Sequence, residues 1–117
     1  MNHFIHPWAM HGDQATTRFG NIAIPLLIKM MLDEGASRSG MEAQIYGGAR
    51  PICDLATRMG EENVILARQI LKDHGIKIIS EDVEGHLGRK VIFNTFTGEA
   101  IVLKVKQLRK TDWRCYP

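Results

Sequence analysis

The sequence predicts an α/β (α+β) domain in which helices flank a layered sandwich of mixed β-sheet. Two segments carry apolar residues at helical spacing, and several shorter ones carry them at every second position. The two kinds of segment follow one another along the chain, and helices between successive strands favour layered packing. The last two strands form a hairpin, which must be antiparallel. The sheet is therefore expected to be mixed.

The composition is that of one soluble domain. The chain has 117 residues, of which 44% are apolar and 24% charged, with a net charge of +2. Basic residues are spread along most of the chain without the dense stripe typical of nucleic-acid binding. No apolar run is long enough for membrane insertion. Two distant cysteines without a CxxC motif favour reduced thiols and a cytoplasmic location.

The first third of the chain is expected to hold a strand, a loop and a helix. Residues 1–6 are predicted to form a short apolar strand or the end of one. Residues 7–20 are predicted to form a loop, because they contain Gly, Pro, Asp and Thr. A helix is predicted over 21–34, with Asn21 as its N-cap and Gly35 as its C-terminal stop.

Strand and helix patterns continue through the middle of the chain. Residues 41–45 alternate apolar and polar side chains, which predicts a half-buried strand that ends in a glycine turn. The segment 60–75 has an apolar face, acidic residues at its start and a final glycine, which predicts the clearest helix. A β-branched strand is expected over 76–80, followed by a loop over 81–88.

The C-terminal part predicts a β-hairpin and a tail. Residues 89–96 and 100–106 alternate around a Thr-Gly turn, whereas 107–117 has no clear period. In the preceding loop, Glu81 and Asp82 could act as an acid–base pair, but a solvated strand end is the simpler interpretation.

An ordered series of short motifs resembles one protein family. HF near the start is followed by RFGN, by a strand that ends in YGGA and by GEEN at a helix start, then by GIKIISEDVEG and GRKVIFNTFTGEAIVLKV. A lone GGA or TG turn occurs in many proteins, but the ordered set is specific and spans nearly all of residues 1–106. By these motifs the chain resembles CheD, the chemoreceptor glutamine deamidase family.

The resemblance implies a fold, a reaction and partners. Members have a layered α/β fold, so the single domain 1–117 is expected to be N-terminally incomplete relative to the family and to miss its N-terminal strands. Members hydrolyse the side-chain amide of selected glutamines on methyl-accepting chemotaxis receptors, which yields glutamates. Many also bind a CheC-type phosphatase. The implied partners are therefore these receptors and, as in many members, that phosphatase, and the thiol chemistry needs no cofactor.

His3 is the catalytic residue that the resemblance implies. The family pairs a Cys nucleophile with a His, and its histidine motif, often HFLLP, matches HFIHP beginning at His3. The family Cys follows a Gly-Ser pair shortly before that histidine, so the nucleophile is expected upstream of Met1 and absent from this chain. Without the resemblance, a surface or core histidine would be the simpler interpretation of His3. His6 occupies a position that is usually apolar in the family.

Five further residues are candidates for substrate binding. Gly47, Gly48 and Ala49 could offer backbone N–H donors to a substrate pocket, although a tight turn that needs positive φ accounts for the glycines equally well. Arg18 and Phe19 could contact the substrate, because the family often has Arg and an aromatic residue there. Packing at the start of the helix is the alternative.

No metal site is predicted, and neither cysteine is a clear replacement nucleophile. His3, His6 and His11 do not fall on one helical face, and no carboxylate or Cys motif accompanies them. Cys53 lies in a segment that is on the active-site side in the family, but nothing around it indicates a low thiol pKa. Cys53 and Cys115 are therefore interpreted as bystander thiols.

Three functional hypotheses stay open at this level, so enzyme activity of the chain itself is uncertain. The chain could belong to an active deamidase whose start lies further upstream, so that Met1 is an internal methionine. It could be a catalytically inactive short form that binds a receptor or a CheC-type phosphatase. It could also be a decayed remnant that folds poorly, because missing strands leave sheet edges unpaired.

Overall fold

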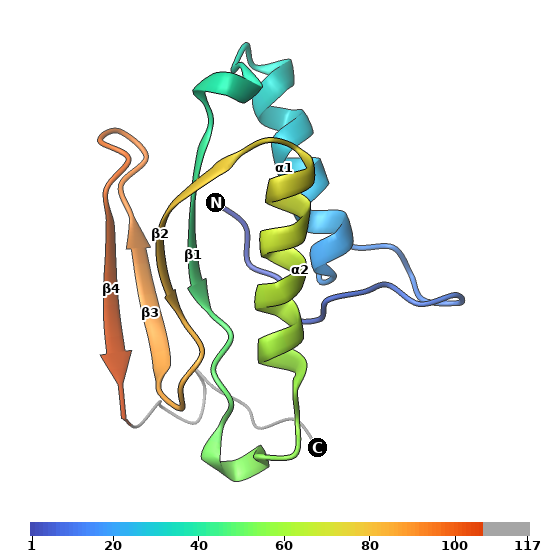
Figure 1. The fold of residues 1–117 in the computed structure, drawn as a ribbon, viewed down its shortest axis with the longest axis vertical. Coiled ribbons are helices and arrows are strands. Elements are labelled where there is room, and N and C mark those ends of the chain that lie inside the picture. Colours follow the sequence, from blue (N-terminus) through green and yellow to red (C-terminus); the bar gives the residue numbers. More distant parts are fainter. Residues whose placement is uncertain (107–117) are drawn as a thin grey trace.

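The domain has helices on one side and strands on the other (Figure 1). The computed structural model describes residues 1–106, apart from the side chain of Cys53. The helices are α1 (Gly20–Asp33) and α2 (Met59–Asp73), and the strands are β1 (Glu42–Gly47), β2 (Lys77–Val83), β3 (Gly88–Phe93) and β4 (Ala100–Val105). Short 3₁₀ turns lie at Arg38–Gly40 and Ile52–Asp54. The α+β class predicted from the sequence is confirmed.

The described strands pair in two separate two-stranded sheets. β1 and β2 are parallel, with Ala43 beside Ile78 and an irregularity after Ala43. β3 and β4 form the antiparallel hairpin, with Val91 beside Val102. Helix α2 connects β1 to β2, as a parallel pair requires. Parallel and antiparallel pairing thus coexist, as the mixed-sheet prediction requires.

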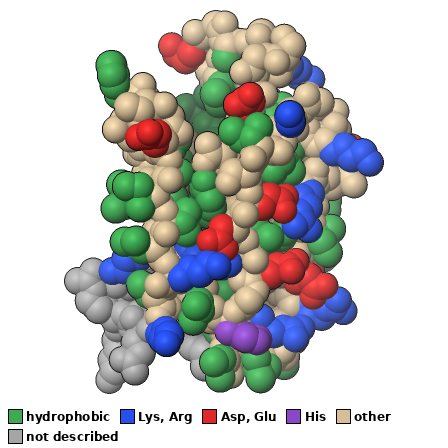
Figure 2. All heavy atoms as spheres, turned by 60° about the vertical axis from the view of Figure 1, so that its left-hand side comes forward, with side chains coloured by type: hydrophobic (Ala, Val, Ile, Leu, Met, Phe, Trp, Pro, Cys, Tyr) green, Lys and Arg blue, Asp and Glu red, His purple; other side chains and the backbone are tan. Residues whose placement is uncertain are grey.

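The hydrophobic core lies between the two helices and the β1–β2 pair. Helix α2 contributes Val64, Ala67 and Leu71, the face that its spacing predicts, and it also buries Leu66. The main core cluster is Ile24, Ile28, Met41, Ala67, Leu71 and Ile76. The hairpin stands outside this core. Its outward face leaves Ile92, Ile101 and Leu103 about half exposed, and apolar side chains are visible along that side of the molecule (Figure 2).

The predicted strand over residues 1–6 is wrong. Pairing in this segment is limited to one isolated parallel bridge between His6 and Phe19. The N–H groups of Ile5 and His6 both donate to the carbonyl of Arg18, at 2.9 and 3.0 Å. Two donors that share one acceptor cannot extend a regular ladder, so the segment is extended without being a strand.

The predicted N-cap of the first helix is also wrong. The helix begins at Gly20, one residue earlier than expected, and Phe19 stands at the cap without a side-chain bond. Asn21 instead accepts the N–H of Ala9 on its Oδ1 at 3.0 Å, which holds the preceding loop against the helix. The end of the helix is as predicted, because Gly35 follows it with φ +99°.

Strand β2 is longer than predicted, because its ladder with β1 continues to Val83, and its two acidic residues pair with arginines. Glu81 and Asp82 belong to the strand rather than to a loop. Arg68 on α2 donates to both carboxylate oxygens of Glu81 at 3.0 and 2.7 Å. Arg89 on β3 donates to Asp82 Oδ1 at 2.9 Å. The two acids are therefore neither an acid–base couple nor freely solvated. Acidic and basic side chains lie next to one another in the middle of the face shown in Figure 2.

The Asp82 pair predicts a specific loss of stability in acid. The bond from Arg89 holds the pKa of Asp82 below its ordinary value of 3.8, and Lys104 acts in the same direction. A carboxyl whose pKa is lower in the folded state stabilises the fold above the unfolded pKa. That contribution is lost as the pH falls through the folded value. Asp82→Asn should therefore flatten the acid limb of the stability profile, measured by denaturant unfolding at a series of pH values.

Asp82→Asn should also lower stability at neutral pH, because the Arg89 side chain is only 5% exposed and loses its anion. Asp33→Asn is the control. Asp33 pairs with Lys29 on the surface of α1, where its side chain is 61% exposed, so the change should cost less than about 0.5 kcal/mol. If the free energy of unfolding fell equally with decreasing pH in Asp82→Asn and in the unmodified chain, the proposed role of Asp82 in acid stability would be contradicted.

Candidate functional site

The segment that carries His3 is extended, and its side chains alternate between two sides. The side chains of Asn2, Phe4 and His6 are half-buried, whereas those of His3 and Ile5 are exposed. This period of two is that of an extended backbone, even though no regular ladder forms. The His3 imidazole therefore faces away from the helices that hold its segment.

An aromatic side chain fixes the segment at the crossing of the two helices. The Phe4 ring packs against the start of α1, where a Cβ on Gly20 would lie 2.7 Å from Phe4 Cε2 and 2.9 Å from Leu66 Cδ2. Only a glycine leaves enough space for both side chains at that point. Phe4 also packs against the core cluster, so the residue after His3 is anchored in the fold.

Two carboxamides bind the segment on either side of His3. Asn2 Nδ2 donates to the carbonyl of Ala23 on α1 at 3.1 Å. Asn63 Nδ2, on α2, donates to the carbonyl of Ile5 at 2.9 Å. The backbone around His3 is thus tied to both helices. Within residues 1–106, the His3 side chain itself makes no hydrogen bond or ion pair, so its ring nitrogens are accessible.

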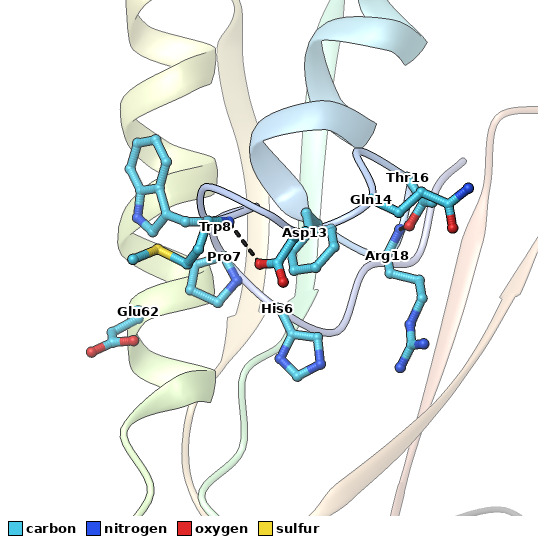
Figure 3. Close-up of a pocket in the computed structure, with 10 residues that line it drawn as sticks. His6, Pro7, Trp8, Asp13, Gln14, Thr16, Arg18 and Glu62 are labelled. Atoms are coloured by element: carbon cyan, nitrogen blue, oxygen red, sulfur yellow. Dashed lines mark hydrogen bonds between the residues drawn. The ribbon is translucent and has the colours of Figure 1, made fainter.

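A shallow cavity of about 620 Å³ lies beside this segment and contains two of the predicted substrate-binding residues (Figure 3). Arg18 and Phe19 line it, together with Glu62 from α2. In this view His6 lies between Glu62 and Arg18. The remaining lining residues are Pro7, Trp8, Met10, Asp13, Gln14 and Thr16. His3 does not line this cavity.

His6 is accommodated at the edge of this cavity by a sulfur and an aromatic ring. Its Nδ1 lies 2.9 Å from Met59 Sδ, and its ring centroid is 5.7 Å from that of Phe19. A thioether has no proton to donate, so this contact is a hydrogen bond in the tautomer that carries its hydrogen on Nδ1. The polar group at this usually apolar position is therefore partly satisfied.

The predicted glycine turn packs directly on the first turn of α2. Gly47 and Gly48 have φ of +118° and +69°, the region that favours glycine. A Cβ on Gly60 would lie 2.6 Å from the carbonyl oxygens of Gly48 and Ala49. The turn and the helix thus meet backbone to backbone. Gly48 lines a second cavity, of about 250 Å³, so the structure does not place it in the same cavity as Arg18.

Two N–H groups of the turn are available as donors. The N–H groups of Gly48 and Ala49 make no hydrogen bond within residues 1–106. The neighbouring groups are engaged: the Gly47 carbonyl accepts the N–H of Glu84 at 2.8 Å. Arg89 braces the same turn, because it donates to the carbonyls of Gly47 and Glu84 at 3.4 and 2.9 Å.

The first two turns of α2 contact several parts of the candidate site. Met59 contacts His6, Gly60 contacts the glycine turn, Glu62 lines the larger cavity, and Asn63 holds the segment with His3. In the sequence, GEEN indicates only a helix start, so Asn63 was not among the predicted site residues. The available signal was an asparagine inside a helix, where its short amide disfavours the helical state unless it has another partner.

No metal-binding cluster of three or more His, Cys, Asp or Glu side chains occurs in the described part of the chain. Within the same residues, neither helix has the length and apolar character needed to cross a membrane. The predictions for Cys115 and the C-terminal tail 107–117 lie outside the described residues, as does the side chain of Cys53.

Comparison with known proteins assigns this α+β domain to a family. The sequence model of the family described as CheD chemotactic sensory transduction matches residues 7–104. The chain therefore belongs to the CheD family. His3 lies just before the matched range, so its role is not covered by that match.

Curated relatives agree with this assignment. A protein of Xanthomonas euvesicatoria is 38% identical over 113 residues, which cover 96% of this chain and 57% of the relative. One of Agrobacterium fabrum is 42% identical over 102 residues, 86% of this chain and 55% of the relative. Both are named probable chemoreceptor glutamine deamidase CheD. The chain thus spans little more than half the length of these relatives.

Proposed function

We propose that this chain is part of a protein-glutamine deamidase that acts on methyl-accepting chemotaxis receptors, with His3 as the histidine of a Cys–His pair. Membership of the CheD family carries the proposal. The exposed imidazole on an anchored backbone supports the role of His3. By the family resemblance, the partner thiol belongs to a segment that precedes His3.

The proposed reaction uses His3 in two opposite proton transfers. A thiolate, favoured by the neighbouring imidazolium, attacks the carboxamide carbon of a receptor glutamine. His3 protonates the nitrogen, the C–N bond breaks and ammonia leaves, which gives a thioester. His3 then takes a proton from water, the hydroxide attacks the thioester carbon and the C–S bond breaks. Glutamate and the free thiolate are the products.

The glycine turn and the larger cavity are proposed to bind the substrate. The tetrahedral intermediates carry an oxyanion, and the unbonded N–H groups of Gly48 and Ala49 are of the type that stabilises such a charge. Arg18 and Phe19 offer a cation and an aromatic surface to the receptor helix around the target glutamine. Their separate cavities mean that the turn and the Arg18 surface would contact different parts of the receptor.

Ammonia release from a purified receptor cytoplasmic fragment tests the proposal. The experiment uses the chain and, where the gene encodes more residues, its complete product. Mass spectrometry of the fragment should show a Gln-to-Glu conversion at specific sites together with free ammonia. Receptor binding without conversion would overturn the deamidase proposal and identify a catalytically inactive binding module.

A CheC-type phosphatase is the second proposed partner, and the family resemblance supports it. We also propose a cytoplasmic location, because two distant cysteines without a CxxC motif favour reduced thiols. Titration of the purified phosphatase into the chain, followed by calorimetry, should show a saturable complex. A His3→Ala variant that binds equally well would separate this interaction from catalysis, whereas absence of binding would refute it.

A further inference from the structure

We propose that Asn63 is a positioning residue for His3, an inference that rests on the proposed function. Asn63 lies in the second turn of α2, and its Nδ2 donates to the carbonyl of Ile5 at 2.9 Å. Ile5 is two residues from His3 and far from Asn63 in the sequence. The bond therefore connects the helix to the segment that presents the catalytic imidazole.

The Ile5 peptide is held from both sides. Its N–H donates to the carbonyl of Arg18, as does the N–H of His6, at 2.9 and 3.0 Å. Its carbonyl accepts from Asn63. Hydrogen bonds to the loop before α1 fix one side of the backbone, and the carboxamide on α2 fixes the other. Without Asn63, the segment keeps its attachment to the loop and the contact of His6 with Met59, but the Ile5 carbonyl loses its hydrogen bond from α2.

The oxygen of the Asn63 carboxamide has no hydrogen-bond partner among the described residues, so Asn63 contributes through its Nδ2 donor. Asn63 Oδ1 is buried and accepts no hydrogen bond from the described residues. A buried acceptor without a partner costs free energy, which an apolar side chain at this position would avoid. A flipped amide would place Oδ1 against the Ile5 carbonyl oxygen, and two acceptors repel each other. The side chain is therefore held in one orientation by its bond to Ile5.

This arrangement has a direct consequence for proton transfer. His3 must reach a thiol and a leaving nitrogen at hydrogen-bond distance, and small displacements of a catalytic group cost large factors in rate. Asn2 and Phe4 anchor the residues next to His3, and Asn63 anchors Ile5. Because His3 itself has no side-chain bond within residues 1–106, its position depends on these backbone anchors.

The first experiment does not depend on activity. Amide hydrogen exchange of Ile5 and His6 is measured by NMR in the chain and in two variants, Asn63→Ala and Asn63→Asp. In both variants the amide hydrogens of Ile5 and His6 should exchange about tenfold faster, because the segment that carries His3 opens more often. Asp has the same shape but no donor when ionised, so it should not restore protection. Amides in the last turns of α2 should be unchanged.

Gln69→Ala is the matched control. Gln69 is another amide of α2, but it is exposed and donates within the helix to Asp73 Oδ1 at 2.7 Å. Its removal should leave the exchange of Ile5 and His6 at the unmodified rate. Unchanged exchange in Asn63→Ala, or the same acceleration in Gln69→Ala, would overturn the proposed positioning role.

The second experiment measures receptor deamidation by the gene's complete product. Asn63→Ala and Asn63→Asp should each lower kcat by about tenfold to a hundredfold. The KM for the receptor fragment should stay within about twofold, because Asn63 does not line the cavity next to Arg18. A structural role that only fills space would be retained by Asp, so full activity of Asn63→Asp would overturn the inference. If the unmodified protein releases no ammonia, the proposed function fails, and the exchange rates alone decide on the positioning role.

Discussion

Replacing Gly48 with alanine is expected to destabilise the fold by about 3 kcal/mol or more. The new Cβ would lie 2.8 Å from the carbonyl oxygen of Gly60 and would overlap Val64 Cγ2. Neither neighbour can give way easily, since one is helix backbone and the other is a buried side chain. The residue would also hold a φ of +69°, which is strained for alanine.

Gly75 is a control that separates the cost of positive φ from the cost of steric overlap at Gly48. Gly75 ends α2 with φ +70°, almost the value of Gly48, but a Cβ there would meet nothing within 4 Å. Gly75→Ala should therefore cost only about 1 kcal/mol, the price of the left-handed conformation. The measurement is denaturant unfolding followed by far-UV circular dichroism. Similar losses in the two variants would show that the turn does not depend on its contact with α2.

The expected difference in stability between Gly48→Ala and Gly75→Ala is large for a domain of this size, whose total free energy of unfolding is expected to be about 5–15 kcal/mol. It also bears on the candidate site. Gly48 places the turn on the same two helical turns that hold the segment with His3. A loss of this contact would therefore disturb the proposed N–H donors and the histidine together.

Elements whose signal lies within a few residues were predicted well from the sequence. The spacing of Val64, Ala67 and Leu71 indicated the buried face of α2, and alternation around a Thr-Gly turn indicated the β3–β4 hairpin. Both patterns lie within a short stretch of sequence, so they can be recognised without knowledge of distant contacts.

Features that depend on distant partners were not predictable. The strand β2 continues through Glu81 because that residue pairs with Ile45 on β1, and Arg68, thirteen residues away, binds its side chain. The first residues were predicted to be a short apolar strand, but the N–H groups of Ile5 and His6 share the Arg18 carbonyl instead of pairing along a ladder. The contact between Asn63 and Ile5 joins residues 58 positions apart. Local pattern contains no information on such pairs, and the site is assembled from them.

Replacing His3 with alanine is expected to lower kcat for receptor deamidation by about a thousandfold or more. The histidine has to protonate the leaving nitrogen and then activate water, so both halves of the reaction lose their proton carrier. The fold should be unaffected, because the side chain is exposed and makes no hydrogen bond within the described residues. The assay is ammonia release by the gene's complete product, together with a thermal melt of each variant.

His11→Ala and His6→Ala distinguish His3 from the other nearby histidines. His11 is exposed in the loop before α1, so its removal should change neither activity nor melting temperature. His6 contacts Met59 and Phe19, so its loss should lower stability, with a much smaller effect on kcat than the loss of His3. A His3→Ala protein that keeps a tenth of the original kcat would show that another group carries the proton. A complete loss in His6→Ala with a normal melt would point to the imidazole beside the larger cavity instead.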